Sequence, residues 1–148
     1  GYGVPTTNEL ATPDRVGRYN HFSGGASIYW TPTTGAHAVQ GRIRDLWAQL
    51  GWETGSLGYP TSDEKATADG EGRQNTFSNG AVVWAPAGGA HAVVGSIYKR
   101  YAELGGVASK LGYPTSNEVA ATGGRASTFQ HGKITWNATT GKTTVTYK

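Results

Sequence analysis

The sequence predicts an α+β protein of three pseudo-symmetric repeats, each with a β-hairpin, a short helix and a Leu-Gly-Tyr-Pro loop. Two observations support this prediction. The segment from Leu57 to Glu64 returns almost unchanged from Leu111 to Glu118, and a weaker copy opens the chain from Gly1 to Glu9. The prolines of these three segments are 55 and 54 residues apart, and a fixed period of this length indicates repeated structural units. We treat residues 1–148 as a single domain with approximate units 1–56, 57–110 and 111–148.

Each unit contains a pattern typical of a β-hairpin. In an extended segment Val82 and Trp84 fall on one face and Val83 on the other. The same alternation occurs in the other two units, with Ile28 and Trp30 and with Ile134 and Trp136. A stretch of turn-forming residues follows, and residues 36–39 then fit a return strand. We therefore expect a hairpin with a short loop in every unit.

A short amphipathic helix is expected after the hairpin in the first two units. The apolar residues of residues 41–50 follow the i, i+3, i+4, i+7 spacing of one helix face. They are Ile43, Leu46, Trp47 and Leu50, with Ile97, Tyr101 and Leu104 at the corresponding places of the second unit. Gly51 and the pair Gly105-Gly106 are natural helix ends. The third unit has no such helix before Lys148.

The units are expected to pack on one another, because a hairpin and one short helix cannot bury a core alone. The simplest arrangement is a propeller-like packing around a pseudo-threefold axis with a common core. It would place the strand tryptophans Trp30, Trp84 and Trp136 near a shared centre. Linear stacking of the units is the alternative.

Composition excludes several classes of protein. The chain has no Cys, so it has no disulfide framework, thiolate nucleophile or Cys-based metal site. The net charge is +3, and the 13 Lys and Arg residues are scattered with no run longer than Lys99-Arg100, which argues against nucleic-acid binding. The apolar stretch 81–87 is too short to span a membrane. Neither a Gly-x-Ser-x-Gly nucleophile elbow nor a phosphate-binding loop occurs.

Four blocks of the second unit occur in order and in phase with the other units. They are Leu57 to Glu64, Phe77-x-x-Gly80-x-x-x-Trp84, Gly89-Ala90-His91 and Leu104-Gly105-Gly106. With these blocks the chain resembles the LGFP repeat over nearly its whole length, with Tyr59 and Tyr113 in place of the family's Phe. It departs from the pattern in the first loop, Gly3-Val4-Pro5, and at Thr143, where His is expected.

The resemblance implies a function at the cell surface. LGFP repeats are modules of the actinobacterial envelope that accompany envelope enzymes such as mycolyltransferases and wall hydrolases. The resemblance therefore implies an extracellular, cell-wall-associated module with arabinogalactan or peptidoglycan glycan as ligand. Its partners would be cell-wall polysaccharide and a fused or associated envelope enzyme, without a metal or organic cofactor.

The histidines His37 and His91 stand at equivalent places beside a turn. They fit either a hydrogen bond to sugar hydroxyls or a structural bond to the loop of the next unit. Repetition favours the structural role, because every unit must fold whereas not every unit must bind. His21 and His131 have no equivalents and are expected at the surface, and no pair of histidines has metal-ligand spacing.

The loop after each proline contains Thr-x-x-Glu, which is the spacing of a helix capping box. Capping or loop scaffolding is the favoured role, and ligand contact is the second. A glycosidase carboxylate pair is the least favoured, because Asp63 becomes Asn117 in the third unit and adjacent carboxylates rarely flank one glycosidic bond.

The tyrosines of the loops, Tyr59 and Tyr113, fit a sugar-stacking platform as well as packing against the preceding helix. Tyr29 is expected on the half-exposed face of its hairpin and is a further candidate for ligand contact. Trp52 is not repeated, since Gly106 stands at its place, and it fits a local lid or a recognition residue.

We expect a non-catalytic carbohydrate-binding module that anchors a protein to the cell wall, without catalytic residues or metal ligands. The predicted ligand-binding residues are His37, His91, Tyr59, Tyr113, Tyr29, Asp63, Glu64, Asn117 and Glu118. A protein–protein interaction scaffold is the first alternative and would show a contiguous apolar surface patch. A small cell-wall hydrolase is the second, and it would need an acid, a base and a nucleophile that converge in one unit.

Overall fold

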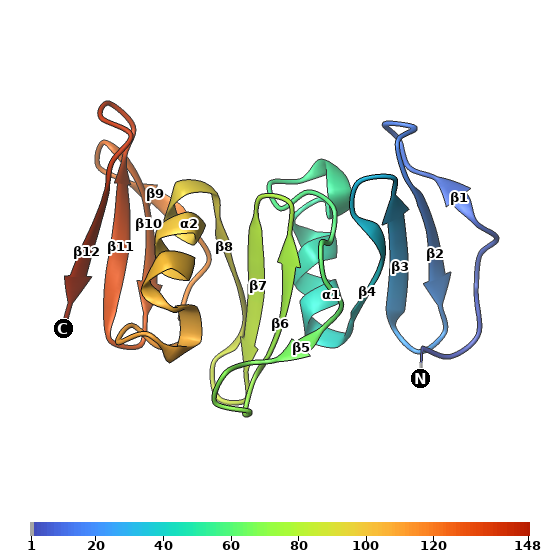
Figure 1. The fold of residues 1–148 in the computed structure, drawn as a ribbon, viewed down its shortest axis with the longest axis horizontal. Helices are drawn as coiled ribbons and strands as arrows, with labels where there is room; N and C mark the ends of the chain where they lie inside the picture. The colour runs from blue at the N-terminus through green and yellow to red at the C-terminus, as the bar shows by residue number, and fades with distance from the viewer. Residues whose placement is uncertain (1) are drawn as a thin grey trace.

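Three antiparallel sheets alternate with two helices along a row in the computed structural model, which describes residues 2–148 (Figure 1). The first sheet contains β1 (Leu10–Ala11), β2 (Arg18–Phe22), β3 (Ala26–Thr31) and β4 (Gly35–Gln40). The second contains β5 (Lys65–Ala66), β6 (Arg73–Phe77), β7 (Gly80–Ala85) and β8 (Gly89–Val94). The third contains β9 (Val119–Ala121), β10 (Gly124–Phe129), β11 (Gly132–Asn137) and β12 (Thr143–Tyr147). Each sheet has four strands in chain order, so the fold is mostly β.

The predicted hairpins are confirmed as the pairs β3–β4, β7–β8 and β11–β12. The prediction missed the two strands that precede each hairpin. The longer of these strands, such as β6, contains mainly polar residues, and its neighbour β5 has only two residues. Neither carries the hydrophobic alternation by which a strand is recognised in a sequence.

The predicted helices are confirmed as α1 (Gly41–Gln49) and α2 (Gly95–Leu104), each followed by one 3₁₀ turn, η1 (Trp52–Thr54) or η2 (Gly106–Ala108). Gly51 and Gly105 lie just beyond the helices with φ of 104° and 113°. Only glycine adopts this left-handed backbone without cost, so these residues end the helices.

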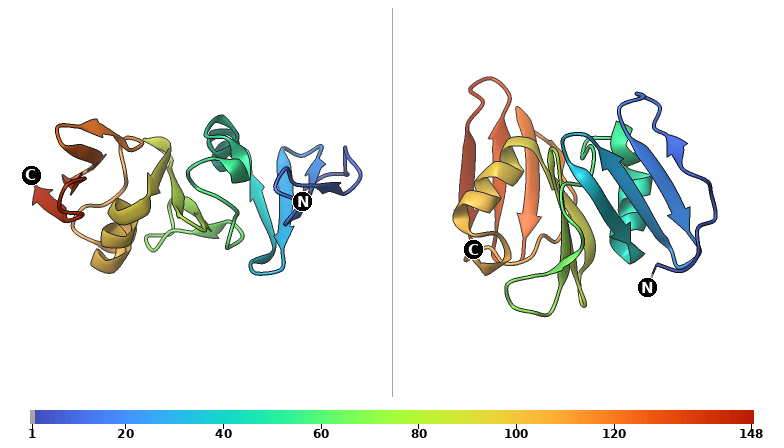
Figure 2. Two further views of the ribbon diagram at one scale, coloured as in Figure 1. Left: turned by 90° about the horizontal axis from the view of Figure 1, so that it is seen from above. Right: turned by 45° about the vertical axis from the view of Figure 1, so that its right-hand side comes forward.

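The predicted propeller-like ring with a common core is not found. The units lie in a row, and the chain runs from one end of it to the other (Figure 2). Helix α1 lies between β3 and β4 on one side and β7 and β8 on the other, and α2 lies in the same way between the second and third sheets. Each helix therefore fills the space between two consecutive sheets, which is the linear alternative.

The core is divided between two junctions. At the first junction, between units 1 and 2, Ile43 and Trp47 of α1 pack with Val82 and Phe77 of the second sheet. At the second junction, between units 2 and 3, the corresponding buried residues are Ile97, Tyr101, Ile134 and Phe129. The middle sheet is buried on both faces, because Val82 and Val83 are 0% and 2% exposed.

The row also explains why the tryptophan prediction was wrong. Trp84 is half-buried beside Arg42 and Leu46 of α1, and Trp136 is half-buried against the second junction. Trp30 stands at the same strand position in unit 1, where no helix of residues 2–148 covers it, and is 42% exposed. There is no shared centre for the three rings to occupy.

The loops from Pro5, Pro60 and Pro114 have one geometry in all three units, because each proline forms the same bridge to a phenylalanine of the sheet. No helix follows these loops, so the Thr-x-x-Glu segments do not cap a helix, and of the two favoured roles loop scaffolding remains. The loops instead hold the sheet, as in the hydrogen bond that Ser62 Oγ accepts from the amide of Thr76 at 3.0 Å.

Candidate functional site

The polar residues predicted to bind ligand lie at the two junctions, where each unit holds its neighbour. Asp63 Oδ1 accepts the amide hydrogen of Ala38 at 3.0 Å, and Asn117 Oδ1 accepts that of Ala92 at 2.9 Å. Ala38 and Ala92 belong to the edge strands β4 and β8, which would otherwise expose unpaired backbone groups. The exchange of Asp for Asn between units follows from this role, because only a side-chain oxygen is required.

His37 and His91 bond within their own hairpins. Their Nε2 atoms lie 2.6 and 2.9 Å from the carbonyl oxygens of Thr34 and Gly88, so each ring closes the turn of its hairpin. His37 Nδ1 also lies 3.3 Å from Asp63 Oδ1 across the first junction. Of these contacts, the one between His37 and Asp63 is the structural bond to the loop of the next unit that was considered for the repeated histidines. The turn contacts lie within one hairpin, and the His91 ring has no bond to the next unit within residues 2–148. The third unit has Thr144, and not Thr143, at the position of the histidine. Thr144 pairs with Thr135 in the same way as His91 pairs with Val83.

Glu64 and Glu118 pair with arginines of their own sheets. Glu64 Oε2 lies 3.4 Å from Arg73 Nη2, and Glu118 Oε2 lies 3.3 Å from Arg125 Nε. Glu64 Oε2 also accepts a hydrogen bond from Gln40 Nε2 at 3.2 Å, which links it to unit 1. Both carboxylates are therefore engaged within the fold.

The tyrosines of the loops connect units through their hydroxyl groups. Tyr59 donates to Asp14 Oδ1 at 2.6 Å, and Tyr113 donates to Asp69 Oδ1 at the same distance. Thr12 and Thr67, 2% and 3% exposed, lie beside these hydroxyls. Gly72 allows the approach, because a Cβ there would lie 2.7 Å from the Tyr113 oxygen. Tyr113 is only 8% exposed, so its ring packs in the junction.

The predicted residues thus form two sets of contacts rather than one pocket. Tyr29 belongs to neither set of contacts. Its predicted half-exposed position is wrong, since it is 3% exposed. Its face points toward α1, whose cover the hairpin pattern alone did not reveal. Burial raises the pKa of its hydroxyl well above the ordinary value of 10.0.

Tyr29 borders an aromatic pocket of about 200 Å³ at the first junction, which we call the Trp52 pocket. It is lined by Pro13, Tyr19, His21, Tyr29, Gly51, Trp52, Glu53 and Thr54. The rings of Tyr19 and Tyr29 stack with centroids 5.0 Å apart, and those of Tyr29 and Trp52 stack at 6.3 Å. The pocket therefore offers aromatic faces together with a carboxyl group and an imidazole.

The polar groups of the Trp52 pocket are held by Arg44 of α1. Its Nε donates to Ser27 Oγ at 2.7 Å, Ser27 Oγ lies 2.6 Å from His21 Nδ1, and the guanidinium lies 5.3 Å from the Trp52 ring centroid. Arg44 Nη2 also lies 3.4 Å from His21 Nδ1, so we assign this nitrogen as an acceptor and the ring proton to Nε2. Burial, followed by the charge of Arg44, lowers the pKa of His21 and keeps the ring neutral.

Glu53 is the unsatisfied group of the pocket. Its Oε2 atom is buried and has no hydrogen-bond partner among residues 2–148. Burial raises the pKa of this carboxyl group above its ordinary value of 4.5. An unpaired buried carboxyl oxygen costs stability, so its presence points to a role outside folding.

Trp52 itself stands on a backbone that favours glycine. Its φ is 56°, and its counterpart at the second junction is Gly106 with φ of 61°. A non-glycine residue in this region costs about 1 kcal/mol or more. The first junction therefore carries a large ring where the repeat elsewhere has no side chain.

Several other residues in and beside the pocket also depart from the repeat. At the second junction Gln74, Thr76, Tyr98 and Val107 stand at the positions of Tyr19, His21, Arg44 and Glu53. Val107 packs there against an apolar cluster instead of lining a polar pocket. Comparing the units position by position finds these unrepeated residues in the sequence. Only Trp52 and His21 were identified in this way, and His21 was expected at the surface, whereas it is half-buried and lines the pocket.

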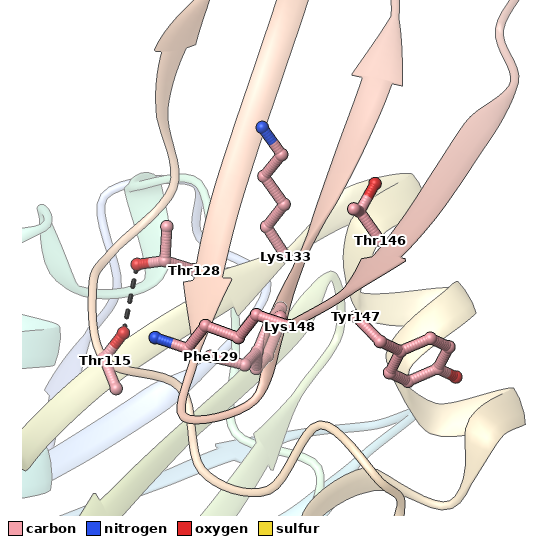
Figure 3. Close-up of a pocket in the computed structure, with 8 residues that line it drawn as sticks. Thr115, Thr128, Phe129, Lys133, Thr146, Tyr147 and Lys148 are labelled. Carbon is pink, nitrogen blue, oxygen red and sulfur yellow. Dashed lines mark hydrogen bonds between the residues drawn. The ribbon is translucent and has the colours of Figure 1, made fainter.

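A larger groove of about 420 Å³ lies on unit 3 (Figure 3). Thr115 and Thr128 hydrogen-bond at 3.0 Å on one side, and Lys133, Thr146 and Tyr147 rise from β11 and β12 on the other. The groove is open and its lysines are exposed. It is a less defined site than the Trp52 pocket, in which rings and hydrogen bonds fix the lining groups.

The alternation of sheet and helix, with the same contacts at both junctions, defines a linear repeat protein. The LGFP repeat matches the chain at residues 3–55, 57–109 and 111–148, so the chain belongs to the LGFP repeat family. A comparison with curated proteins found no match. Within residues 2–148 neither helix has the length and apolar character needed to cross a membrane.

Proposed function

We propose that this protein is a non-catalytic carbohydrate-binding module that anchors its carrier to the cell wall, and that the Trp52 pocket is its glycan site. The observation that carries this proposal is Trp52, an aromatic residue on a left-handed backbone in a pocket whose Tyr19, His21 and Glu53 are also unrepeated. Membership of the LGFP repeat family supports a wall-associated location.

The chemistry of the pocket suits a sugar ring. The C–H face of a pyranose or furanose packs on aromatic rings, and its hydroxyls need donors and acceptors close by. Tyr19 and Trp52 provide ring surface, and His21 Nε2 provides a donor that has no protein partner among residues 2–148. Glu53 is a carboxyl group to which sugar hydroxyls can donate.

Binding rather than hydrolysis is the favoured activity. Asp14 is the carboxylate whose charge acts on the pKa of Glu53. Hydrogen bonds from Thr12 and Tyr59 lower the pKa of Asp14 itself. Asp69 makes the same contacts at the second junction, where no Glu53 counterpart exists. Asp14 therefore has a structural role, which leaves Glu53 without a dedicated catalytic partner.

Sedimentation with purified actinobacterial walls tests the proposal, with intact walls and with walls stripped of arabinogalactan. Trp52→Gly gives the first junction the residue of the second and should reduce the pelleted fraction at least tenfold at limiting wall concentration. Trp30→Ala is the matched control, since it removes an exposed tryptophan on the face of β3 opposite to the pocket residue Tyr29, and it should pellet as the wild type does.

Binding to intact but not stripped walls would identify arabinogalactan, and binding to both would identify peptidoglycan. Equal pelleting of wild type and Trp52→Gly would disprove the proposed site. Release of reducing sugar by the wild type but not by Glu53→Gln would replace the binding module with a hydrolase. A His37→Ala/His91→Ala variant tests the repeated histidines in the same assay.

A further inference from the structure

The outer face of unit 1 carries apolar residues at positions that are covered by a helix in the other two units. Under α1 the positions are occupied by Leu57, Phe77 and Val82, which are 0%, 4% and 0% exposed. Under α2 they are Leu111, Phe129 and Ile134, which are 0%, 1% and 0% exposed. The same bridge between loop proline and sheet phenylalanine fixes the correspondence in all three units.

In unit 1 the same positions lie open at one end of the row (Figure 1). Tyr2 is 37% exposed, and Phe22 and Ile28 are half-buried. Val4, at the position of Tyr59, is 67% exposed, and Trp30 is 42% exposed. We call these five residues the outer apolar face. The rings of Tyr2 and Phe22 lie 6.2 Å apart, and Ile28 and Trp30 share one face of β3. A group of accessible apolar side chains is typical of a protein-binding surface.

Both occupied junctions share one hydrogen bond between helix and loop. Trp47 Nε1 of α1 donates to the carbonyl oxygen of Gly58 at 3.1 Å, and the Tyr101 hydroxyl of α2 donates to that of Gly112 at 2.8 Å. Gly3 has the same left-handed backbone, with φ of 84° against 77° and 74°. Within residues 2–148 no side chain donates to the Gly3 carbonyl, so the acceptor is present without its donor.

The opposite end of the row has different chemistry. On the face of the second sheet toward unit 3, Ala81, Val83 and Val93 are 3%, 2% and 0% exposed, and Val93 packs with Ile97 of α2. Unit 3 has Lys133, Thr135 and Thr146 at these positions, and Figure 3 shows Lys133 and Thr146 on its free surface. A helix packed on this face would place its apolar side chains against polar groups. The outer apolar face of unit 1 is therefore better suited to receive a further helix.

We propose that the outer apolar face binds the amphipathic helix that ends another LGFP repeat unit. The helix would pack aliphatic side chains on Phe22 and Ile28, as α1 and α2 pack on Phe77 and Phe129. An aromatic residue four positions after the first of these aliphatics, as in Ile43 and Trp47 or Ile97 and Tyr101, would donate to the Gly3 carbonyl.

The occupant is a helix of another repeat unit and not an intact second copy of this chain. Both helices of a copy are enclosed between two sheets, and the free face of its unit 3 is polar. The proposal rests on the two occupied junctions and is independent of the proposed glycan site.

A fusion protein tests this binding. Residues 95–109 are placed directly before Gly1, so that α2 reaches Tyr2 through the connection by which it normally reaches Leu111. The fused segment should form a helix detectable by circular dichroism, raise the melting temperature by about 4 °C or more, and shield Trp30 from an aqueous quencher. The matched control carries Ser at the fused copies of Ile97 and Tyr101 and should show none of these effects.

Ile28→Lys in the fusion should abolish the gain in melting temperature. If Ile28→Lys does not fold, Val4→Asp in the fusion should likewise abolish the gain in melting temperature. Because Val4 is 67% exposed, this substitution should not prevent folding. Equal melting temperatures for the fusion and its control, with the added segment unfolded, would refute the proposal. If the fusion gains no stability but loses wall pelleting, the face is a glycan contact and the proposal is also refuted.

Discussion

The hydroxyl group of Tyr59 donates a hydrogen bond of 2.6 Å to Asp14, 45 residues earlier in the chain, and thereby connects units 1 and 2. Tyr113 and Asp69 repeat this bond between units 2 and 3. Each tyrosine also lies within 3 Å of a buried threonine of the preceding unit. The contact explains why tyrosine serves in these loops, because a phenylalanine would leave the aspartate without this donor.

Removal of the hydroxyl group should therefore loosen the junction. We expect Tyr59→Phe to lower the free energy of unfolding by about 1 kcal/mol, since one hydrogen bond is lost and its aspartate is exposed to solvent. Urea denaturation measures the change. Tyr2→Phe is the control, because the Tyr2 hydroxyl has no partner in the described chain, and an equal loss in both variants would contradict the prediction.

The same contact predicts a dependence of stability on acid. Hydrogen bonds from Thr67 and Tyr113 lower the pKa of Asp69 from 3.8 to about 2 in the folded protein. The contribution of this carboxylate is therefore present above pH 3.8 and is lost as the pH falls through about 2. Denaturation between pH 5 and pH 2 should show a smaller loss for Asp69→Asn than for the wild type. Parallel curves would show that Asp69 is not linked to folding.

Trp52 allows a test of the backbone separately from the ring. Because its φ is 56°, Trp52→Gly should be more stable than Trp52→Ala by about 1 kcal/mol, even though both variants lose the same ring contacts. In the exposed part of α2 the order should be reversed, so that Ala102→Gly costs about 1 kcal/mol. Chemical denaturation of the three variants decides the point, and a Trp52→Ala variant as stable as Trp52→Gly would argue against backbone strain.

Glu53 should cost stability at neutral pH. Burial raises the pKa of this carboxyl group above 4.5, so the folded protein carries a penalty for the ionised form above that pH. Glu53→Gln should raise the melting temperature at pH 7, and the gain should vanish as the pH falls below 4.5. Glu103→Gln, on the exposed side of α2, serves as the control and should change little. A gain that persists at low pH would assign the effect to shape and not to charge.

Much of the local structure was predictable. The hairpins followed from the alternation at Val82 and Trp84, and the helices from the spacing of Ile43 and Trp47, because the backbone geometry of a strand or helix places regularly spaced side chains on one face. The strands β2, β6 and β10 were missed because they are largely polar. They are stabilised by backbone hydrogen bonds to the hairpin, and such bonds do not require a particular pattern of side chains in the strand.

The candidate site was harder to predict. The residues at equivalent places of the units, such as His37 and His91, were predicted as ligand contacts, and the structure shows them in structural contacts. The Trp52 pocket is formed instead by residues in which one junction differs from the other. Tyr19 and Trp52 meet there only because α1 folds back over the first sheet, which no local pattern indicates.

The sequence by itself determined that this protein is a three-unit repeat of hairpins and helices, since repetition and periodicity are properties of the chain. Only the tertiary structure decided that the units form an open row, that Trp30 is exposed and that Trp52 lines a pocket. The physical reason is that ring and row contain the same elements. They differ in which face of each sheet the next helix covers, and that choice depends on the packing of whole junctions and not on any one segment.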